Sequence, residues 1–556
     1  MLSCKWNSLE MPKDGPLDQL SVLDADRVQL AISLIEGSEE VLKLEESLKR
    51  HTGRPRSLSV KAIFSALLLL ALDDRPLILK SVTELLYFGL TPEQKERLGV
   101  VGRPKDYGQF LAFYRRVRYM FHLICSEVDP SPLPKNLCIE NEMLLAMAKP
   151  LSESASADKA ALLLRLSNSL LDQSIKLMSG DELKSYDGQV GLDATVVPLF
   201  SRGPSKTKGT CASDPDGGWY IREGDHRDSE DHKGRRRTKI AWALEATIAT
   251  MAQIKSNGSP GGVSFGHPNL VLGFTMSRPG VDPGGNGIKV LRSISDRGYR
   301  PGYLGADRAY STAVPENFHL PLKALGYSLV MDYRIDQLGR QANSGGALLI
   351  EGSWYCPNIP EPLIDATLEF RMGKIEDDIY EKHIAAREKY LLRRKCGPDQ
   401  DGYERYSCPA IGDYPKVSCP IRPASIREGR IKVTLTNPSW ELTPAICNQS
   451  SITIAPDVGA RHRQELCFAT TEWHRQYATL RNTIEGLKGY VKDPCHEALS
   501  QPGRRRVRGI APQSIFVAML LMASNVRKIK SYRAEQSYRQ KPKRAKRRRT
   551  SLSQFA

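Results

Sequence analysis

Residues 189–200 read QVGLDATVVPLF, in which β-branched and small apolar residues surround a single acid, Asp193. This composition is typical of a buried strand. An aspartate inside such a strand is costly, because a buried carboxylate must be paired or must bind a metal ion. The stretch therefore predicts a sheet that carries a functional acid.

The pattern continues beyond this strand. We expect strand, strand, helix, strand, helix and strand at residues 239–251, 269–277, 285–297, 303–306, 315–325 and 327–333. The residues between the first two strands read as a long polar loop, with a turn at residues 214–218. Asp307 directly follows the strand at 303–306. Asp193 and Asp307 should each lie at or near a strand end, where a sheet of this type opens to ligands.

We expect the first 150 residues to be helical, since residues 22–36 and 60–72 carry apolar residues at helical spacing. Thr91 and Gln94 are spaced to form a capping box at the start of one helix. Residues 107–128 combine aromatic residues with arginines, namely Arg115, Arg116 and Arg118. An all-helical module with basic faces is compatible with DNA binding, and equally with a plain scaffold whose arginines are solvated.

The segment 336–465 is rich in Pro, Gly and Cys, which predicts an inserted β-rich domain. Its cysteines include no C-x2-C pair, the strong zinc signature, and we expect buried free thiols rather than a zinc site. Two of them sit in a repeated local pattern, SCPAI and SCPIR. The cysteines are Cys356, Cys396, Cys408, Cys419 and Cys447.

The C-terminal part returns to helix, at residues 472–491 and again at 512–527. Residues 531–556 form a strongly basic segment that we expect to be disordered and to contact phosphates without sequence preference. The two most apolar stretches, 62–72 and 515–523, are shorter than the about 20 residues a membrane span requires. With no signal pattern at the start, we expect a soluble, cytoplasmic chain.

The 556 residues carry a formal net charge of +17, with 80 Lys and Arg against 63 Asp and Glu. A surplus of this size concerns partners rather than the fold. Nucleic acid is the expected partner, because neutralising its phosphates releases counterions.

A third acid lies in the helix expected at 472–491. Arg481, Glu485, Lys488 and Lys492 follow one another at i, i+4, i+7 and i+11, which places them in one stripe. One carboxylate among three bases suits a metal ligand beside phosphate-binding cations. An ordinary solvated helix face with an Arg–Glu pair is the alternative.

Asp193, Asp307 and Glu485, in this order of strands, resemble the acids of the DDE transposases of bacterial insertion sequences. The branch of these enzymes with a YREK signature has a Tyr, an Arg and a Lys around its last acid, matched here by Tyr477, Arg481 and Lys492. Tyr477 stands one residue further from the Arg than in the usual pattern. The resemblance covers roughly residues 186–526.

The resemblance implies an RNase H-like core in two parts, residues 186–335 and 466–530, interrupted by the β-rich insertion. It implies two Mg²⁺ or Mn²⁺ ions, with Asp193 on both, Asp307 on one and Glu485 on the other. Arg481, Lys488, Lys492, Tyr477 and Arg308 would contact DNA. The partners would be transposon-end and target DNA, bound by a homodimer in the cytoplasm, associated with the nucleoid when on DNA.

Two other functions remain open from the residues alone. An RNase H-fold nuclease would cut DNA without joining strands, and a DNA-binding derivative would have kept the fold without catalysis. In the insertion, Trp354 and Trp440 would stack on a displaced base or pack in a core, and core packing is the expected use of either.

Overall fold

The computed structural model describes residues 23–49, 58–100, 107–205, 207, 209–223, 238–253, 266–307, 310, 312–426, 433–434 and 444–540. The chain is an α/β protein that divides into two compact units, each built from three segments. Unit 1 is Met1–Ser174, Val197–Leu244 and Lys492–Ala523, and unit 2 is Ile175–Val196, Glu245–Val491 and Ser524–Ala556.

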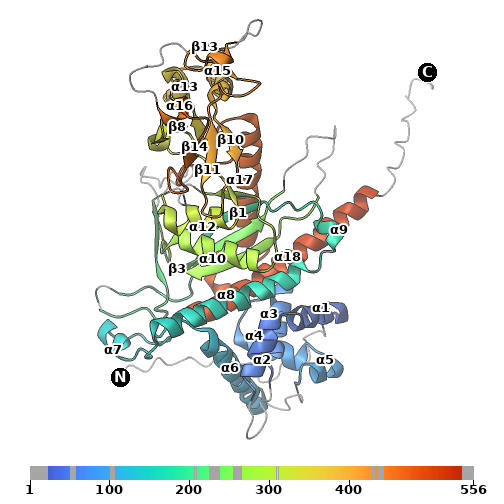
Figure 1. Cartoon of the computed structure of the whole chain (residues 1–556). Helices are drawn as coiled ribbons and strands as arrows, with labels where there is room; N and C mark the ends of the chain where they lie inside the picture. Colours follow the sequence, from blue (N-terminus) through green and yellow to red (C-terminus); the bar gives the residue numbers. More distant parts are fainter. Residues whose placement is uncertain are drawn as a thin grey trace, which may run out of the picture. The chain divides into compact units, whose positions relative to one another are not determined.

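The N-terminal part of unit 1 is all helical, as predicted (Figure 1). The helices are α1 (Ala25–Glu36), α2 (Glu39–Ser47), α3 (Val60–Leu72), α4 (Leu79–Phe88), α5 (Pro92–Arg97), α6 (Tyr107–Val128), α7 (Asn141–Ala146) and α8 (Glu153–Ile175). The predicted capping box is confirmed, since Thr91 and Gln94 each bond the other's backbone N–H at the start of α5.

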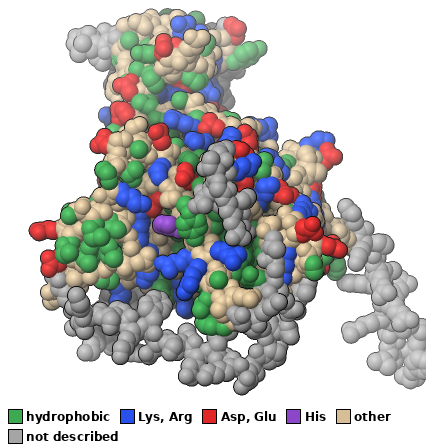
Figure 2. All heavy atoms as spheres, turned by 90° about the horizontal axis from the view of Figure 1, so that it is seen from below, with side chains coloured by type: hydrophobic (Ala, Val, Ile, Leu, Met, Phe, Trp, Pro, Cys, Tyr) green, Lys and Arg blue, Asp and Glu red, His purple; other side chains and the backbone are tan. Residues whose placement is uncertain are grey.

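Helix α6 has the basic outer face expected from its sequence. Phe113, Val117 and Ile124 are among its buried residues. Arg115 and Arg116 lie on the opposite side and are exposed. Figure 2 shows Lys and Arg side chains in several groups among apolar ones on the face that it displays. This distribution is compatible with DNA binding and with a solvated scaffold alike.

One mixed sheet follows the helical region, in the order β2-β3-β1-β5-β6, with β4 also paired to β3. Its strands are β1 (Val190–Pro198), β2 (Gly218–Glu223), β3 (Thr238–Met251), β4 (Val271–Ser277), β5 (Tyr303–Ala306) and β6 (Ser328–Val330). Strands β1, β5 and β6 run parallel, whereas β3 is antiparallel to β2 and β4. The expected strands are present, and β2 is an additional strand within the region predicted to be loop.

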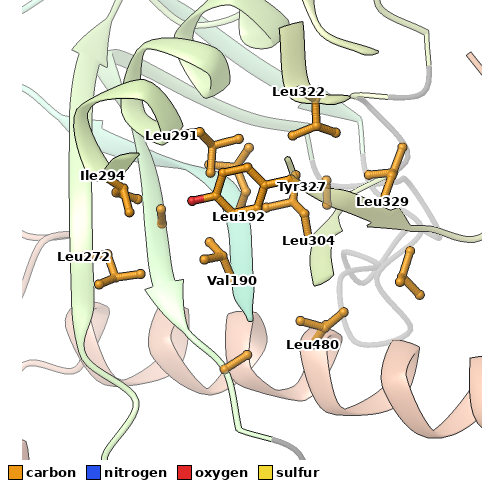
Figure 3. Packing of buried hydrophobic residues seen from close by; sticks show 14 of the residues in the cluster. Val190, Leu192, Leu272, Leu291, Ile294, Leu304, Leu322, Tyr327, Leu329 and Leu480 are labelled. Carbon is orange, nitrogen blue, oxygen red and sulfur yellow. The ribbon is translucent and has the colours of Figure 1, made fainter. Parts of the chain in front are cut away.

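Helices cover both faces of the sheet within unit 2. Helices α10 (Pro283–Asp296) and α12 (His319–Ala324) provide Leu291 and Leu322 to the core on one face. Helix α17 (Thr471–Lys492) provides Leu480 from the other. Figure 3 shows this arrangement, with Leu480 across the strands from Leu291 and Leu322.

Two glycines let α17 approach the strands closely. A Cβ at Gly305 would stand 2.5 Å from the Leu480 Cβ, and a Cβ at Gly191 would stand 2.6 Å from Ile484 Cγ1. Carbon atoms do not approach this closely, so either side chain would force the helix away from the sheet. Glycine is required here by space, not by a special backbone conformation.

We expect Gly305→Ala to lower the free energy of unfolding by about 1–3 kcal/mol, the usual cost of overpacking a filled core. The matched control is Gly486→Ala on α17 itself, where an added Cβ meets nothing within 4 Å. That control should stabilise by roughly 0.5–1 kcal/mol, because alanine favours a helix interior. Urea titrations of both variants measure these changes. An unchanged free energy of unfolding in Gly305→Ala would show that α17 does not press on β5.

The insertion is less purely β than predicted. It has three-stranded sheets β7-β8-β9 and β10-β11-β14 and the pair β12-β13. These are β7 (Arg340–Ser344), β8 (Ala347–Ile350), β9 (Ser353–Tyr355), β10 (Arg393–Cys396), β11 (Glu404–Ser407), β12 (Val417–Ser418), β13 (Val433–Thr434) and β14 (Ile452–Ile454). Its helices were not expected: α13 (Glu361–Ile364), α14 (Ala366–Arg371), α15 (Asp377–Arg387) and α16 (Ala445–Asn448). The longest of these helices, α15, was not predicted because its polar sequence has no clear apolar periodicity.

The last helix, α18 (Ile510–Gln540), is longer than predicted. Residues 531–540 are helical, which corrects the expectation of disorder for that stretch. In unit 2, Arg533 pairs with Glu182 at 2.9 Å and Tyr532 donates to the Gly266 carbonyl. Residues 541–556 lie outside the described residues. Ile510–Tyr538 is long and apolar enough to cross a membrane, but 83% of its most apolar window is buried inside the protein, as in a core helix of a soluble protein.

The predicted turn at 214–218 contains two acids that hold the start of α18 within unit 1. Asp214 accepts the N–H of Gly509 at 3.1 Å, and Asp216 accepts that of Ile510 at 2.9 Å. Asp214 is fully buried. Burial raises its pKa to about 6, against the pull of the Gly509 N–H, and the charge of Asp216 adds to the rise.

This raised pKa gives a pH dependence of stability. The folded state holds the Asp214 proton more tightly than the unfolded state. Protonation of Asp214 therefore stabilises the fold fully below the ordinary pKa of 3.8, and this stabilisation is lost as the pH rises to about 6. The loss should approach about 3 kcal/mol at 1.36 kcal/mol per pKa unit. Asp214→Asn should abolish this part of the pH dependence, measured as the difference between the two proteins in urea midpoint from pH 4 to pH 7.

Candidate active site

Asp193 and Asp307 lie side by side at the neighbouring strands β1 and β5. Strands β1 and β5 pair in parallel, and the last pair is Leu192 with Ala306. Each aspartate is the next residue along its chain. Side chains alternate along a strand, so Asp193 shares the face of Gly191 and Asp307 follows on the face of Gly305. That face is the one against which α17 packs.

Helix α17 brings its charged residues to this face. Leu480 lies against Gly305 and Ile484 against Gly191, which fixes the rotation of the helix about its own axis. Arg481 and Glu485 directly follow these two residues and are exposed. The charge of Arg481 interacts with those of Glu485 and Asp307. The two strand acids and the helix acid are thus linked through neighbouring charges.

Asp193 is paired with Lys488, one turn further along α17. The side chain of Asp193 is 13% exposed and that of Lys488 is 25% exposed. Burial raises the pKa of Asp193 and outweighs the lowering effect of Lys488, and the charge of Asp307 raises it further. A buried carboxylate beside a second carboxylate requires a cation, and Lys488 supplies one.

Arg481 is held by Tyr477, whose hydroxyl accepts a hydrogen bond from Arg481 Nη1 at 3.1 Å. This bond is the main reason that the pKa of Arg481 is raised. The ring of Tyr477 stacks on Trp473, with centroids 4.7 Å apart. Although Tyr477 is one residue out of the family spacing, it positions Arg481. Lys492 is the last residue of α17, and Arg308 lies outside the described residues.

Sequence reasoning missed one further acid, Glu245 on β3. It accepts the N–H of Gly280 at 3.0 Å. Its pKa is raised by burial, and the charge of Asp193 adds to the rise. The signal was available, since Glu245 is the single acid in a 14-residue strand, as Asp193 is in β1.

No set of three or more His, Cys, Asp or Glu side chains among the described residues already stands in a metal-ligating arrangement. The donors suit Mg²⁺ by chemistry, since carboxylate oxygens from β1, β5 and α17 are hard ligands. The Lys488 ammonium is now placed on Asp193, so a metal ion would have to displace it.

One cavity lies away from these acids. It has a volume of about 460 Å³ and lies between α12 and the insertion, within unit 2. Its carboxylates are already paired, Glu404 with Lys323 and Arg463, and Glu465 with Arg394. Trp354 also borders it but is only 3% exposed, which fits core packing. Trp440 lies outside the described residues.

Comparisons of the chain with protein-family models, with curated proteins and with solved structures find no match. The function of the chain is therefore inferred from its own residues.

The Asp193–Lys488 pair can be measured by a double-mutant cycle in EDTA. Lys488→Met leaves a buried carboxylate without its cation and should destabilise the protein by about 1–3 kcal/mol. Adding Asp193→Asn should recover much of that loss, because the neutral amide needs no cation. Urea denaturation of the four proteins gives the coupling energy. Additive effects of the two substitutions would mean that the pair contributes nothing.

Proposed function

We propose that the chain is a DDE-type DNA transposase that cleaves transposon ends and joins them to target DNA. One observation carries the proposal. Asp193 and Asp307 follow the last residue pair of two parallel strands, on the face covered by the helix that bears Glu485 and Arg481. Two neighbouring strand acids, with cations on the helix that covers them, are candidates for a metal-dependent active site.

The order of the strands supports an RNase H-like core. Strands β4, β3, β1, β5 and β6 lie side by side, with the first two antiparallel and the last three parallel. Hydrogen bonds from Leu199 N to Trp242 O and from Ala252 N to Gln189 O make β1 antiparallel to β3. This is the arrangement implied by the resemblance to DDE transposases, and the insertion between Asp307 and Glu485 also suits that family.

In this function the three acids hold divalent ions. Two such ions supply an activated water and a stabilised leaving oxygen for phosphodiester chemistry. Asp193, at the centre of the group, would contact both, with Asp307 and Glu485 on one each. Glu245, behind Asp193, keeps further negative charge near the site. The rigid packing of α17 on Gly191 and Gly305 would fix the position of Glu485 relative to the strand acids.

The cations of α17 suit the substrate. Arg481 is exposed and already oriented by Tyr477, so its remaining N–H groups can contact a phosphate. Lys488 would turn to the DNA once a metal ion takes its place on Asp193, and Lys492 continues the same stripe. The net charge of +17 favours DNA binding generally. The exposed arginines of α6 would contribute to end recognition by a homodimer in the cytoplasm.

Asp193→Asn should abolish both the first nick and strand transfer, because one site serves the successive steps. Glu485→Gln should act in the same direction, and less severely if Glu485 binds one ion. DNA binding should survive, since neutralising an acid near phosphates does not weaken attraction to them. Mn²⁺ should support cleavage, whereas Ca²⁺ should allow binding with little cleavage. The assay is metal-dependent nicking of a labelled terminal repeat, with gel shifts in parallel.

The matched control is Glu472→Gln, an exposed acid of α17 that pairs with Arg475 near the start of the helix. It should cleave at the wild-type rate. Wild-type activity in Asp193→Asn, or cleavage that persists in EDTA, would exclude the two-metal mechanism. Cleavage without strand transfer would indicate a nuclease, and specific binding without cleavage would indicate a silent derivative.

A further inference from the structure

Three cysteines of the insertion begin the same local turn. Each is followed by proline and lies directly after a strand, β9, β11 or β12. In each turn the N–H of the third residue after the cysteine donates to the cysteine carbonyl. The bonds are Ile359 to Cys356 at 3.1 Å, Ile411 to Cys408 at 3.1 Å and Arg422 to Cys419 at 2.9 Å.

In two of these turns a backbone N–H also points at the sulfur. Ala410 N–H donates to Cys408 Sγ at 3.5 Å. The N–H of Asn358 bonds the sulfur of Cys356 and favours its thiolate form. In both cases the donor lies two residues after the cysteine. Donors aimed at sulfur orient a thiolate and stabilise its charge, as the surroundings of metal ligands do.

A fourth cysteine, Cys447 on α16, packs against the same apolar cluster as the other three. Cys356, Cys408 and Cys419 are at most 5% exposed and belong to one apolar cluster, against which Cys447 packs. Burial raises the pKa of Cys356 and, to about 11, that of Cys447. Each of these two thiols also interacts electrostatically with Cys408 and Cys419. Four thiols from separate segments therefore gather in one place.

Two arginines offset negative charge there. Arg422 and Arg393 lower the pKa of Cys408, against the dominant effect of burial, and Arg422 does the same for Cys447. Arg393 is fixed by the carbonyl of Ile411, at 3.0 Å. Four thiolates around a divalent ion carry a net charge of −2, for which guanidinium groups nearby are favourable.

The insertion is built from short elements. Among its described residues the sheets have two or three strands each, and the longest helix, α15, has 11 residues. Short elements have weak individual preferences, so contacts between distant segments hold the insertion together. The cysteines that the structure describes are all free.

We propose that Cys356, Cys408, Cys419 and Cys447 bind one structural zinc ion. Thiolates are soft ligands that select zinc over magnesium, and four of them complete a closed tetrahedral site. Among the described residues these thiols are not yet in a ligating arrangement, so binding requires them to turn toward a common point. The thiol protons pass to solvent as the metal binds. This site is separate from the acids and independent of the proposed catalysis.

The test is the zinc content of the full chain, purified without chelator and dialysed. We expect about one zinc per chain, as for a closed tetrathiolate site. Cys356→Ser and Cys447→Ser should each weaken zinc binding at least about tenfold, because one of four ligands is lost. The matched control is Cys396→Ser, which removes an exposed cysteine of the same insertion and should keep the zinc.

If the variants do not fold, wild-type protein alone can still show whether the four thiols bind a metal ion. Cobalt in place of zinc should give the charge-transfer absorption of thiolate ligands. Dialysed protein without zinc that takes up neither zinc nor cobalt would overturn the proposal, as would a disulfide between any of the four cysteines. Asp193→Asn should retain the zinc, so loss of zinc in that variant would place the metal at the acids instead. Failure of DNA cleavage has no bearing on either outcome.

Discussion

The close approach of α17 to strands β1 and β5 is the constraint on which the candidate site depends. Two glycines, Gly191 and Gly305, leave no Cβ between the strands and the helix, so Leu480 and Ile484 rest on the backbone of the sheet. That contact fixes both the distance of the helix from the sheet and its rotation about its own axis. Lys488 is consequently paired with Asp193, and the charge of Arg481 interacts with that of Asp307.

The same face of the sheet carries a buried negative charge that a lysine of the protein neutralises. Asp193 is largely buried beside Asp307, with Glu245 nearby, and burial disfavours its charged form. Lys488 compensates for that charge. Acids clustered in this way lower the stability of the fold, and natural proteins keep such arrangements mainly at functional positions. In the proposed function, a metal ion would have to displace Lys488 from Asp193.

The insertion follows a different principle. It has an apolar cluster that includes three of the thiols, with the fourth packed against it, and a buried ion pair of Arg387 with Glu351. Its helices and short strands have weak individual preferences, so contacts between segments far apart in the sequence hold it together. A metal ion among the thiols would make those contacts independent of a large core. The catalytic face and the insertion would then use metals of opposite chemical character.

The sequence by itself determined the helical N-terminal part, the main strands and the positions of both strand acids. It could do so because apolar periodicity and a lone acid in an apolar run are local features. The turns Cys408-Pro409 and Cys419-Pro420 were visible as a repeat, but Cys356-Pro357 and Cys447 were not connected with them, since nothing local shows that four segments meet. Likewise β2, the helix α15 and the extension of α18 to Gln540 depend on packing partners distant in sequence. Only the tertiary structure placed Lys488 on Asp193, because a helix stripe predicts which residues share a face but not which charge that face will meet.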